Sequence, residues 1–157
     1  MILIDIRKPY QEHISIQFVE NIAINIFKYL GIGPLTDLSI LIGSDQAIRK
    51  LNKDYRGIDR TTDVLSFESG EENPDTGVIS LGDIAISFPT AKKQAVLAGH
   101  PVENEVALLL VHAILHLLGY DHDSTKEKSI MWKKQQSLLD SLGVKINRIS
   151  GDNEFHD

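Results

Sequence analysis

The chain has 157 residues, which suits a single domain with one substantial core. Its formal net charge of −6 argues against a generally basic surface, so a polyanion must be met by a local patch. There are no cysteines, which excludes disulfides and leaves histidine and carboxylate to bind any metal. Charges at Asp5 and Arg7 interrupt the N-terminus before a signal-peptide core develops, and no run approaches the ~18 apolar residues of a membrane span. We therefore expect a cytoplasmic protein that does not bind membranes.

The spacing of apolar residues predicts one domain over residues 1–157, of the α+β (mixed α/β) class, with a small sheet packed by helices. About four strands are predicted, over residues 2–6, 38–42, 61–67 and 78–87. About five helices are predicted, over residues 15–30, after the N-cap Ser44, and over 89–98, 102–118 and 125–142. Gly82 marks a bulge or a close backbone approach. Segment 69–77 predicts an exposed loop, and residues 144–157 predict a polar tail in which His156 is frayed.

Three of the six histidines lie in one stretch, HAILHLLGYDH, which runs from His112 to His122. His112 and His116 are four residues apart, so on a helix their side chains share one face. Gly119 can adopt the left-handed conformation that ends helices, and a turn there brings His122 back toward the other two. Three imidazoles plus one open position are a common ligand set for catalytic zinc. The sequence therefore predicts one Zn2+ per chain, bound by these three histidines and a water.

The spacing H-x-x-x-H-x-x-G-x-x-H is that of the metzincin metalloproteases, so the predicted three-histidine zinc site is metalloprotease-like. In those enzymes the residue after the first histidine is a glutamate that acts as general base. Here that position holds Ala113, which cannot transfer a proton. The pattern therefore favours a zinc-dependent hydrolase whose substrate is not a peptide.

A basic segment precedes the third predicted strand. Residues 48–60 carry five positive and two negative side chains, a net charge of +3 in a chain that is negative overall. Such a run is most often a solvated helix face. Arg56, just before the turn at Gly57, is a functional candidate because the planar fork of arginine matches phosphate. Other cations of the segment are candidates for binding substrate: Lys50, Lys53 and Arg60.

Three segments, YRGIDRTTDVLSF, LGDIAIS and HAILHLLGYDH, in this order resemble the YbeY family of bacterial endoribonucleases over roughly residues 40–125. The resemblance implies a zinc-dependent endoribonuclease that is specific for single-stranded RNA. It further implies a role in ribosomal RNA maturation, notably at the 3′ end of small-subunit RNA, and in ribosome quality control. The expected partners are ribosomal RNA and the ribosome or its proteins, and DNA is not expected. The family's zinc ligands fall on His112, His116 and His122, and its catalytic arginine falls on Arg56.

Two positions depart from the family pattern. Ala113 stands where members usually have glycine, which exchanges one small residue for another. Glu68 stands where members often have proline. This second departure changes the expected shape of the loop after Phe67, and with it the edge of the substrate groove.

Two other functions fit the same residues. A metal-dependent hydrolase of a peptide or an ester would need a carboxylate near the metal for proton transfer, and Asp121 or Asp123 is the nearby candidate. A non-catalytic, ribosome-associated factor would use zinc only to hold the chain together. Structural zinc sites are closed by four protein ligands, whereas three histidines leave a position open.

Overall fold

The computed structural model describes residues 1–147, which form a four-stranded sheet and five α-helices. The strands are β1 (Ile2–Ile6), β2 (Thr36–Gly43), β3 (Val64–Glu72) and β4 (Ile79–Ser87). The helices are α1 (Ile16–Leu30), α2 (Asp45–Arg56), α3 (Phe88–Ala98), α4 (Val102–Leu117) and α5 (Thr125–Leu142), with a short 3-10 helix at Tyr10–Glu12. The predicted α+β class is therefore confirmed. Within the described part of the chain, no helix is both long and apolar enough to cross a membrane.

The sheet is mixed and has the strand order β1-β2-β4-β3. β1 pairs with β2, and β2 with β4, in parallel, whereas β3 pairs antiparallel with β4. β3 is therefore an edge strand, with β4 on one side only. The outer edge of β3 is open to side chains that arrive from elsewhere in the chain.

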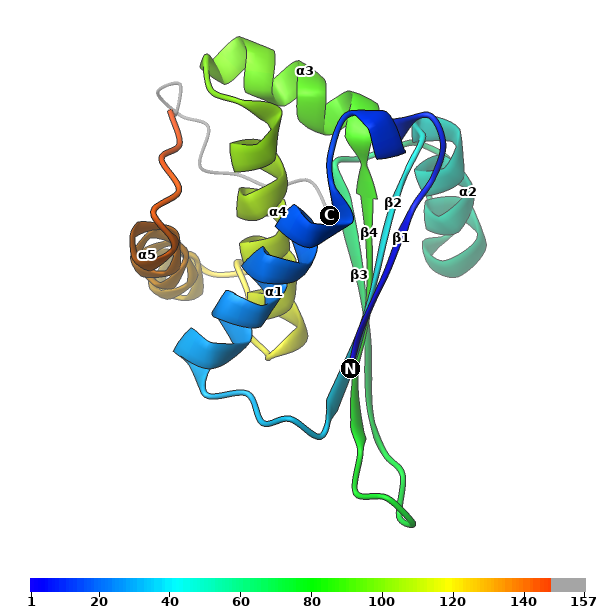
Figure 1. Cartoon of the computed structure of the whole chain (residues 1–157), viewed down its shortest axis with the longest axis vertical. Coiled ribbons are helices and arrows are strands. Elements are labelled where there is room, and N and C mark those ends of the chain that lie inside the picture. Colours follow the sequence, from blue (N-terminus) through cyan, green and yellow to red (C-terminus); the bar gives the residue numbers. More distant parts are fainter. Residues whose placement is uncertain (148–157) are drawn as a thin grey trace.

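Helices cover the two faces of the sheet unequally (Figure 1). α1, α4 and α5 lie on one face, and α2 lies on the other. The larger core cluster joins strand residues such as Ile40 and Ile84 to α1 and α4, whereas a smaller cluster joins Ile48 of α2 to Leu65 and Ala85. The sheet therefore separates the helix with the basic segment from the helix with the first two histidines.

Helix α4 runs through the centre of the larger layer. Every residue from Glu105 to Leu115 is buried, and His112 is only 1% exposed. The helix contacts β3 and β4 on one side and α1, α3 and α5 on the others. Because α4 is packed against other elements on all sides, it has no solvent-facing polar side. This explains why the residues around the two histidines are apolar.

The structure differs from the sequence prediction around the third strand. β3 begins at Val64 rather than at residue 61, and residues 69–72 belong to the strand rather than to a loop. After a register shift, Glu71 pairs with Ser80 of β4, so cross-strand pairing extends a segment whose composition predicts a loop. The β3–β4 hairpin projects beyond the helices (Figure 1). Its exposed part is acidic and carries Glu68, Glu71, Glu72 and Asp75.

The predicted polar tail begins later than residue 144. Val144 and Ile146 pack against the core, and the backbone N–H of Asn147 donates to Nδ1 of His100 at 2.9 Å. Alternating apolar residues and a histidine whose side chain is 4% exposed therefore hold residues 144–147. Residues 148–157, with the predicted frayed His156, lie outside the described residues.

Gly82 lies where β4 meets both β3 and the end of α4. Its φ is +146°, and a Cβ built there would lie 2.2 Å from the carbonyl oxygen of Phe67 and 3.0 Å from Cδ2 of Leu117. The pairing of β4 with both neighbours also shifts register beside this residue. The close approach predicted for Gly82 is confirmed, and it allows the end of α4 to rest directly on the sheet.

We expect Gly82→Ala to destabilise the protein much more than Gly57→Ala. Gly57 also has a positive φ, +71°, but its Cβ would meet nothing within 4 Å. The backbone conformation alone costs about 1 kcal/mol, whereas the clash at Gly82 should raise the loss to about 3 kcal/mol or more. Thermal unfolding would then show a Tm loss of roughly 6–12 °C for Gly82→Ala. Equal losses in the two variants would contradict the close approach.

Candidate metal centre

Helix α4 and the loop after it bring three histidines together. His112 and His116 lie one turn apart on α4, and Gly119, with a φ of +100°, turns the chain so that His122 returns toward them. The ring centroid of His112 lies 5.8 Å from each of the other two, which are 5.5 Å apart. Rings that bind one zinc ion at about 2.0–2.1 Å have centroids about 5 Å apart. The three rings therefore lie close to the spacing that a shared ion requires.

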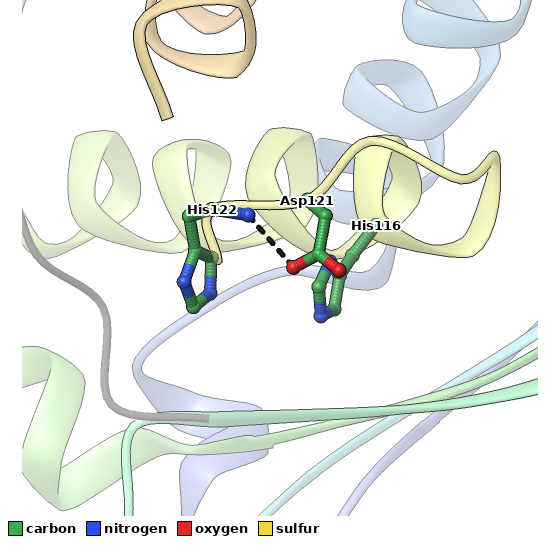
Figure 2. Close-up of side chains that lie close together, drawn as sticks. All are labelled: His116, Asp121 and His122. Atoms are coloured by element: carbon green, nitrogen blue, oxygen red, sulfur yellow. Dashed lines mark hydrogen bonds between the residues drawn. The ribbon is translucent and has the colours of Figure 1, made fainter. Parts of the chain in front are cut away.

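Asp121 joins this group from the loop (Figure 2). One ligand atom each from His116, Asp121 and His122 lies within 4.8 Å of the others, and all three residues are half-buried. The backbone N–H of His122 donates to Oδ1 of Asp121 at 2.7 Å, and this bond lowers the pKa of the carboxyl. The hydrogen bond with Asp121 raises the pKa of the exposed Asp123 instead. Asp121, for which the sequence suggests only proton transfer, is thus an ionised carboxylate placed among the candidate ligands.

Hydrogen bonds to the outer ring nitrogens orient two of the histidines. Nδ1 of His112 lies 2.7 Å from Oε1 of Gln135, and Nδ1 of His116 lies 2.8 Å from the carbonyl oxygen of Tyr120. Because a carbonyl oxygen only accepts, Nδ1 carries the proton and Nε2 keeps the lone pair that a metal ligand needs. The donor set therefore fits a divalent ion that prefers imidazole nitrogen and carboxylate oxygen.

Arg56 is the last residue of α2 and contacts the edge strand β3. Its Nη2 donates to the carbonyl oxygen of Ser66 at 2.7 Å, and its guanidinium carbon lies 5.3 Å from the centre of the Phe67 ring. The carbonyl oxygen of Phe67 and the side chain of Leu117 both lie next to Gly82. This part of β3 therefore lies beside the end of α4. Arg56 is thereby anchored on the strand against which the histidine helix ends.

The other candidate cations are exposed and lie before and after Arg56 in the basic segment. Lys50 and Lys53 are on α2, which covers the opposite face of the sheet from α4 (Figure 1). Lys50 forms an ion pair with Asp54 at 3.0 Å. Arg60 lies in the loop between α2 and β3 and lines a shallow hollow. The structure thus keeps Lys50 and Lys53 on the other side of the sheet from the histidines.

Reasoning from the sequence missed Gln135, which is only 2% exposed and lies on α5. Its neighbours on the same helix face are buried and apolar: Met131, Leu138 and Leu139. The sequence does contain a signal for this residue, which is a glutamine among apolar residues on one helix face. Such a position predicts a buried amide, and a buried amide needs a hydrogen-bond partner. The partner, His112, lies 23 residues away in the chain.

An α+β domain with clustered histidines and a carboxylate at the end of a buried helix has the kind of site that metal-dependent hydrolases use. The family model described as Endoribonuclease YbeY matches residues 5–143 of the sequence. The chain therefore belongs to the endoribonuclease YbeY family.

Similar proteins share most of their length with this chain. The Endoribonuclease YbeY of Desulforamulus reducens is 41% identical over 143 residues, which cover 85% of this chain and 94% of the relative. That of Persephonella marina is 41% identical over 136 residues, which cover 86% and 88%. The solution structure of TM1509 from Thermotoga maritima has a TM-score of 0.59 and 25% identity, and covers 100% of this chain and 97% of that one. The likeness therefore extends well beyond the motifs at residues 40–125.

We expect the purified protein to carry about one divalent metal ion per chain and His116→Ala to lose it, because the variant removes one of few ligands. His13→Ala is the matched control, since His13 stacks on Phe88 outside the metal centre. Elemental analysis of the three proteins measures the metal content. Full metal content in His116→Ala would contradict the assignment.

Proposed function

We propose that this chain is a zinc-dependent endoribonuclease that cleaves single-stranded RNA. Membership in the endoribonuclease YbeY family supports RNA as substrate and cleavage within the RNA chain as the reaction. The observation that carries the metal dependence is the convergence of His112, His116 and His122, two of them oriented through Nδ1. We further propose that the protein acts in the cytoplasm, in ribosomal RNA maturation at the 3′ end of small-subunit RNA and in ribosome quality control, together with the ribosome or its proteins.

Zinc is the ion that we assign, because imidazole and carboxylate are the available ligands and the chain has no cysteine. When bound, zinc supplies a Lewis acid that polarises a phosphoryl oxygen and activates water. His112 and His116 would hold the ion from a rigid helix, which limits reorganisation during the reaction. The half-buried positions of His116, Asp121 and His122 leave the ligands accessible to a substrate from solvent.

Arg56 is proposed to bind the phosphate that is cleaved. Its bond to Ser66 and its contact with Phe67 hold the guanidinium against the sheet edge. That bond uses one N–H, whereas a guanidinium has five, so others can donate to a phosphate oxygen. A cation fixed in this way stabilises the negative charge of a phosphodiester without moving.

The cations Lys50, Lys53 and Arg60 are proposed to bind RNA that flanks the cleaved bond. Because α2 and α4 lie on opposite faces of the sheet, one RNA chain that reaches both must bend around the edge strand β3. A single strand can bend in this way, whereas a regular duplex is stiff and its backbone is held in a helix. The ion pair of Lys50 with Asp54 is exposed and costs little to open.

Two rival functions depend on Asp121. A peptide or ester hydrolase could use it as the carboxylate that Ala113 fails to supply, and a non-catalytic factor could use it as a fourth, closing ligand. If Asp121 closes a structural site, Asp121→Asn should release the ion and lower the Tm as His116→Ala does. Under our proposal, the ion depends on the three histidines and Asp121→Asn keeps it.

We expect Arg56→Ala to lower the rate of RNA cleavage by about 10²–10³-fold. This is the typical effect of removing one hydrogen-bond donor that stabilises the transition state. Metal content should be unchanged, and the Tm should fall only slightly because one part-buried hydrogen bond contributes about 1 kcal/mol. Arg56→Lys should recover only part of the activity, since lysine lacks the bidentate fork.

The matched control for this measurement is Arg49→Ala, which removes an exposed arginine of the same helix whose ion-pair partner, Asp59, lies in the loop after α2. Its cleavage rate should stay near that of the parent. A loss of stability in Arg56→Ala as large as that of a core mutation would assign Arg56 a structural role instead.

We expect cleavage of a single-stranded RNA, little cleavage of the same RNA annealed to its complement, and none of casein. All activity should vanish in His116→Ala. RNA binding should weaken with salt, with a slope of roughly −2 to −3 in log affinity against log salt for a few phosphate contacts. The measurements are the cleavage rates on the three substrates and the RNA affinity at a series of salt concentrations.

Each rival gives a different result in this experiment. Casein cleavage that requires His116, with RNA left intact, would support the peptide hydrolase and reject the ribonuclease. RNA binding without cleavage of any substrate, by protein that carries its full metal content, would support the non-catalytic factor.

A further inference from the structure

We propose that Gln135 of α5 is a positioning residue for His112, and that its amide oxygen sets which ring nitrogen His112 offers to the metal. The inference rests on the proposed metal-dependent function and adds a residue outside the histidine motif. Gln135 approaches His112 through the outer nitrogen Nδ1, at 2.7 Å. It is therefore a residue that acts through a ligand and does not touch the ion or the substrate.

The burial of Gln135 requires a reason. The residue is 2% exposed and lies in the apolar stripe that α5 packs against the core, between Met131 and Leu138. A leucine or methionine would fit this stripe without desolvating an amide, which costs about 1–3 kcal/mol when the hydrogen bonds of the amide are lost. The short hydrogen bond to His112 offsets that cost and accounts for a polar residue at this position.

The bond has a definite chemical effect on His112. A neutral imidazole carries its proton on one nitrogen and a lone pair on the other. With Oε1 of Gln135 as acceptor, the proton stays on Nδ1 and the lone pair stays on Nε2, the nitrogen that can bind a metal. His116 is oriented in the same way by the carbonyl of Tyr120. Both ligands on α4 thus have an outer acceptor, one from the backbone and one from a side chain that mutation can remove.

The position of Gln135 also ties a separate helix to the metal centre. α4 and α5 contact each other, and Gln135 reaches His112 from the side of α5. His112 cannot rotate about its side-chain bonds without breaking this hydrogen bond. The ring is thereby held in its ligand orientation before an ion arrives, which lowers the entropic cost of binding.

The test compares zinc dissociation constants of the parent and of two Gln135 variants by competition with a chromophoric chelator. Gln135→Met keeps the volume but removes the acceptor, and we expect zinc affinity to fall by about 10–100-fold. Gln135→Glu keeps an acceptor oxygen and should bind zinc nearly as tightly as the parent. Gln136→Met is the matched control, because Gln136 is exposed on the same helix and its Nε2 donates to Oδ1 of Asp140 at 3.0 Å, away from the histidines.

A second readout uses the metal-free protein. Nitrogen NMR of the imidazoles should place the proton of His112 on Nδ1 in the parent and shift it partly to Nε2 in Gln135→Met. A purely structural role would lower the Tm of the metal-free variant while leaving both the tautomer and the zinc affinity unchanged. If Gln135→Met fails to fold, Gln135→Asn supplies the comparison, since it withdraws the oxygen by one methylene and keeps the amide.

The outcomes separate this inference from the function on which it rests. If the parent binds no zinc, or His116→Ala binds as tightly as the parent, the proposed metal centre is wrong and the role of Gln135 falls with it. If His116→Ala loses zinc while the acceptor-free Gln135 variant keeps the parent's affinity and tautomer, only the role of Gln135 is overturned.

Discussion

The enclosure of α4 is the constraint on which the rest of the structure depends. Every residue from Glu105 to Leu115 is buried, so the helix cannot turn or slide without exposing apolar surface at roughly 25 cal/mol per Å². His112 and His116 consequently project from a helix whose position is fixed by the packing of the core. Gly82 contributes by letting the end of the helix rest on β4. The placement of the two candidate ligands on α4 is therefore a property of the core, and the loop supplies only His122.

The sheet imposes a second constraint, because it keeps the basic segment and the histidines on different faces. Arg56 is the residue that relates the two. It ends α2, but its guanidinium is bonded to Ser66 of the edge strand, which lies beside the end of α4. An arginine in the middle of α2 would face solvent or the smaller core instead. The position at the helix end, just before the turn at Gly57, is thus what allows a cation from α2 to bond to the edge strand beside the end of α4.

The parts of the structure that the sequence predicted are those that local interactions determine. Ser44 accepts the backbone N–H of Ala47 and starts α2 where expected, and Gly119 turns the chain because its own conformation permits it. The strand over residues 69–72 was missed because it depends on pairing with β4, which composition does not reveal. The apolar residues around Gln135 indicate that it is buried, but its partner was missed for the same reason, since the bond depends on how α5 crosses α4. No local pattern indicates which sheet face a helix covers, so the separation of Lys50 from the histidines had no sequence signal.

The β3–β4 hairpin gives one edge of the sheet an uneven charge. Arg56 and Arg60 stand near the start of β3, whereas the far part of the hairpin carries acidic side chains at Glu71, Glu72 and Asp75. With a Debye length of about 8 Å at physiological salt, charges at the two ends act on different parts of a long polyanion. Phosphates are attracted at one end of this edge and repelled at the other. The hairpin therefore gives the sheet edge a charge gradient, which makes the two directions along β3 inequivalent for any polyanion that approaches it.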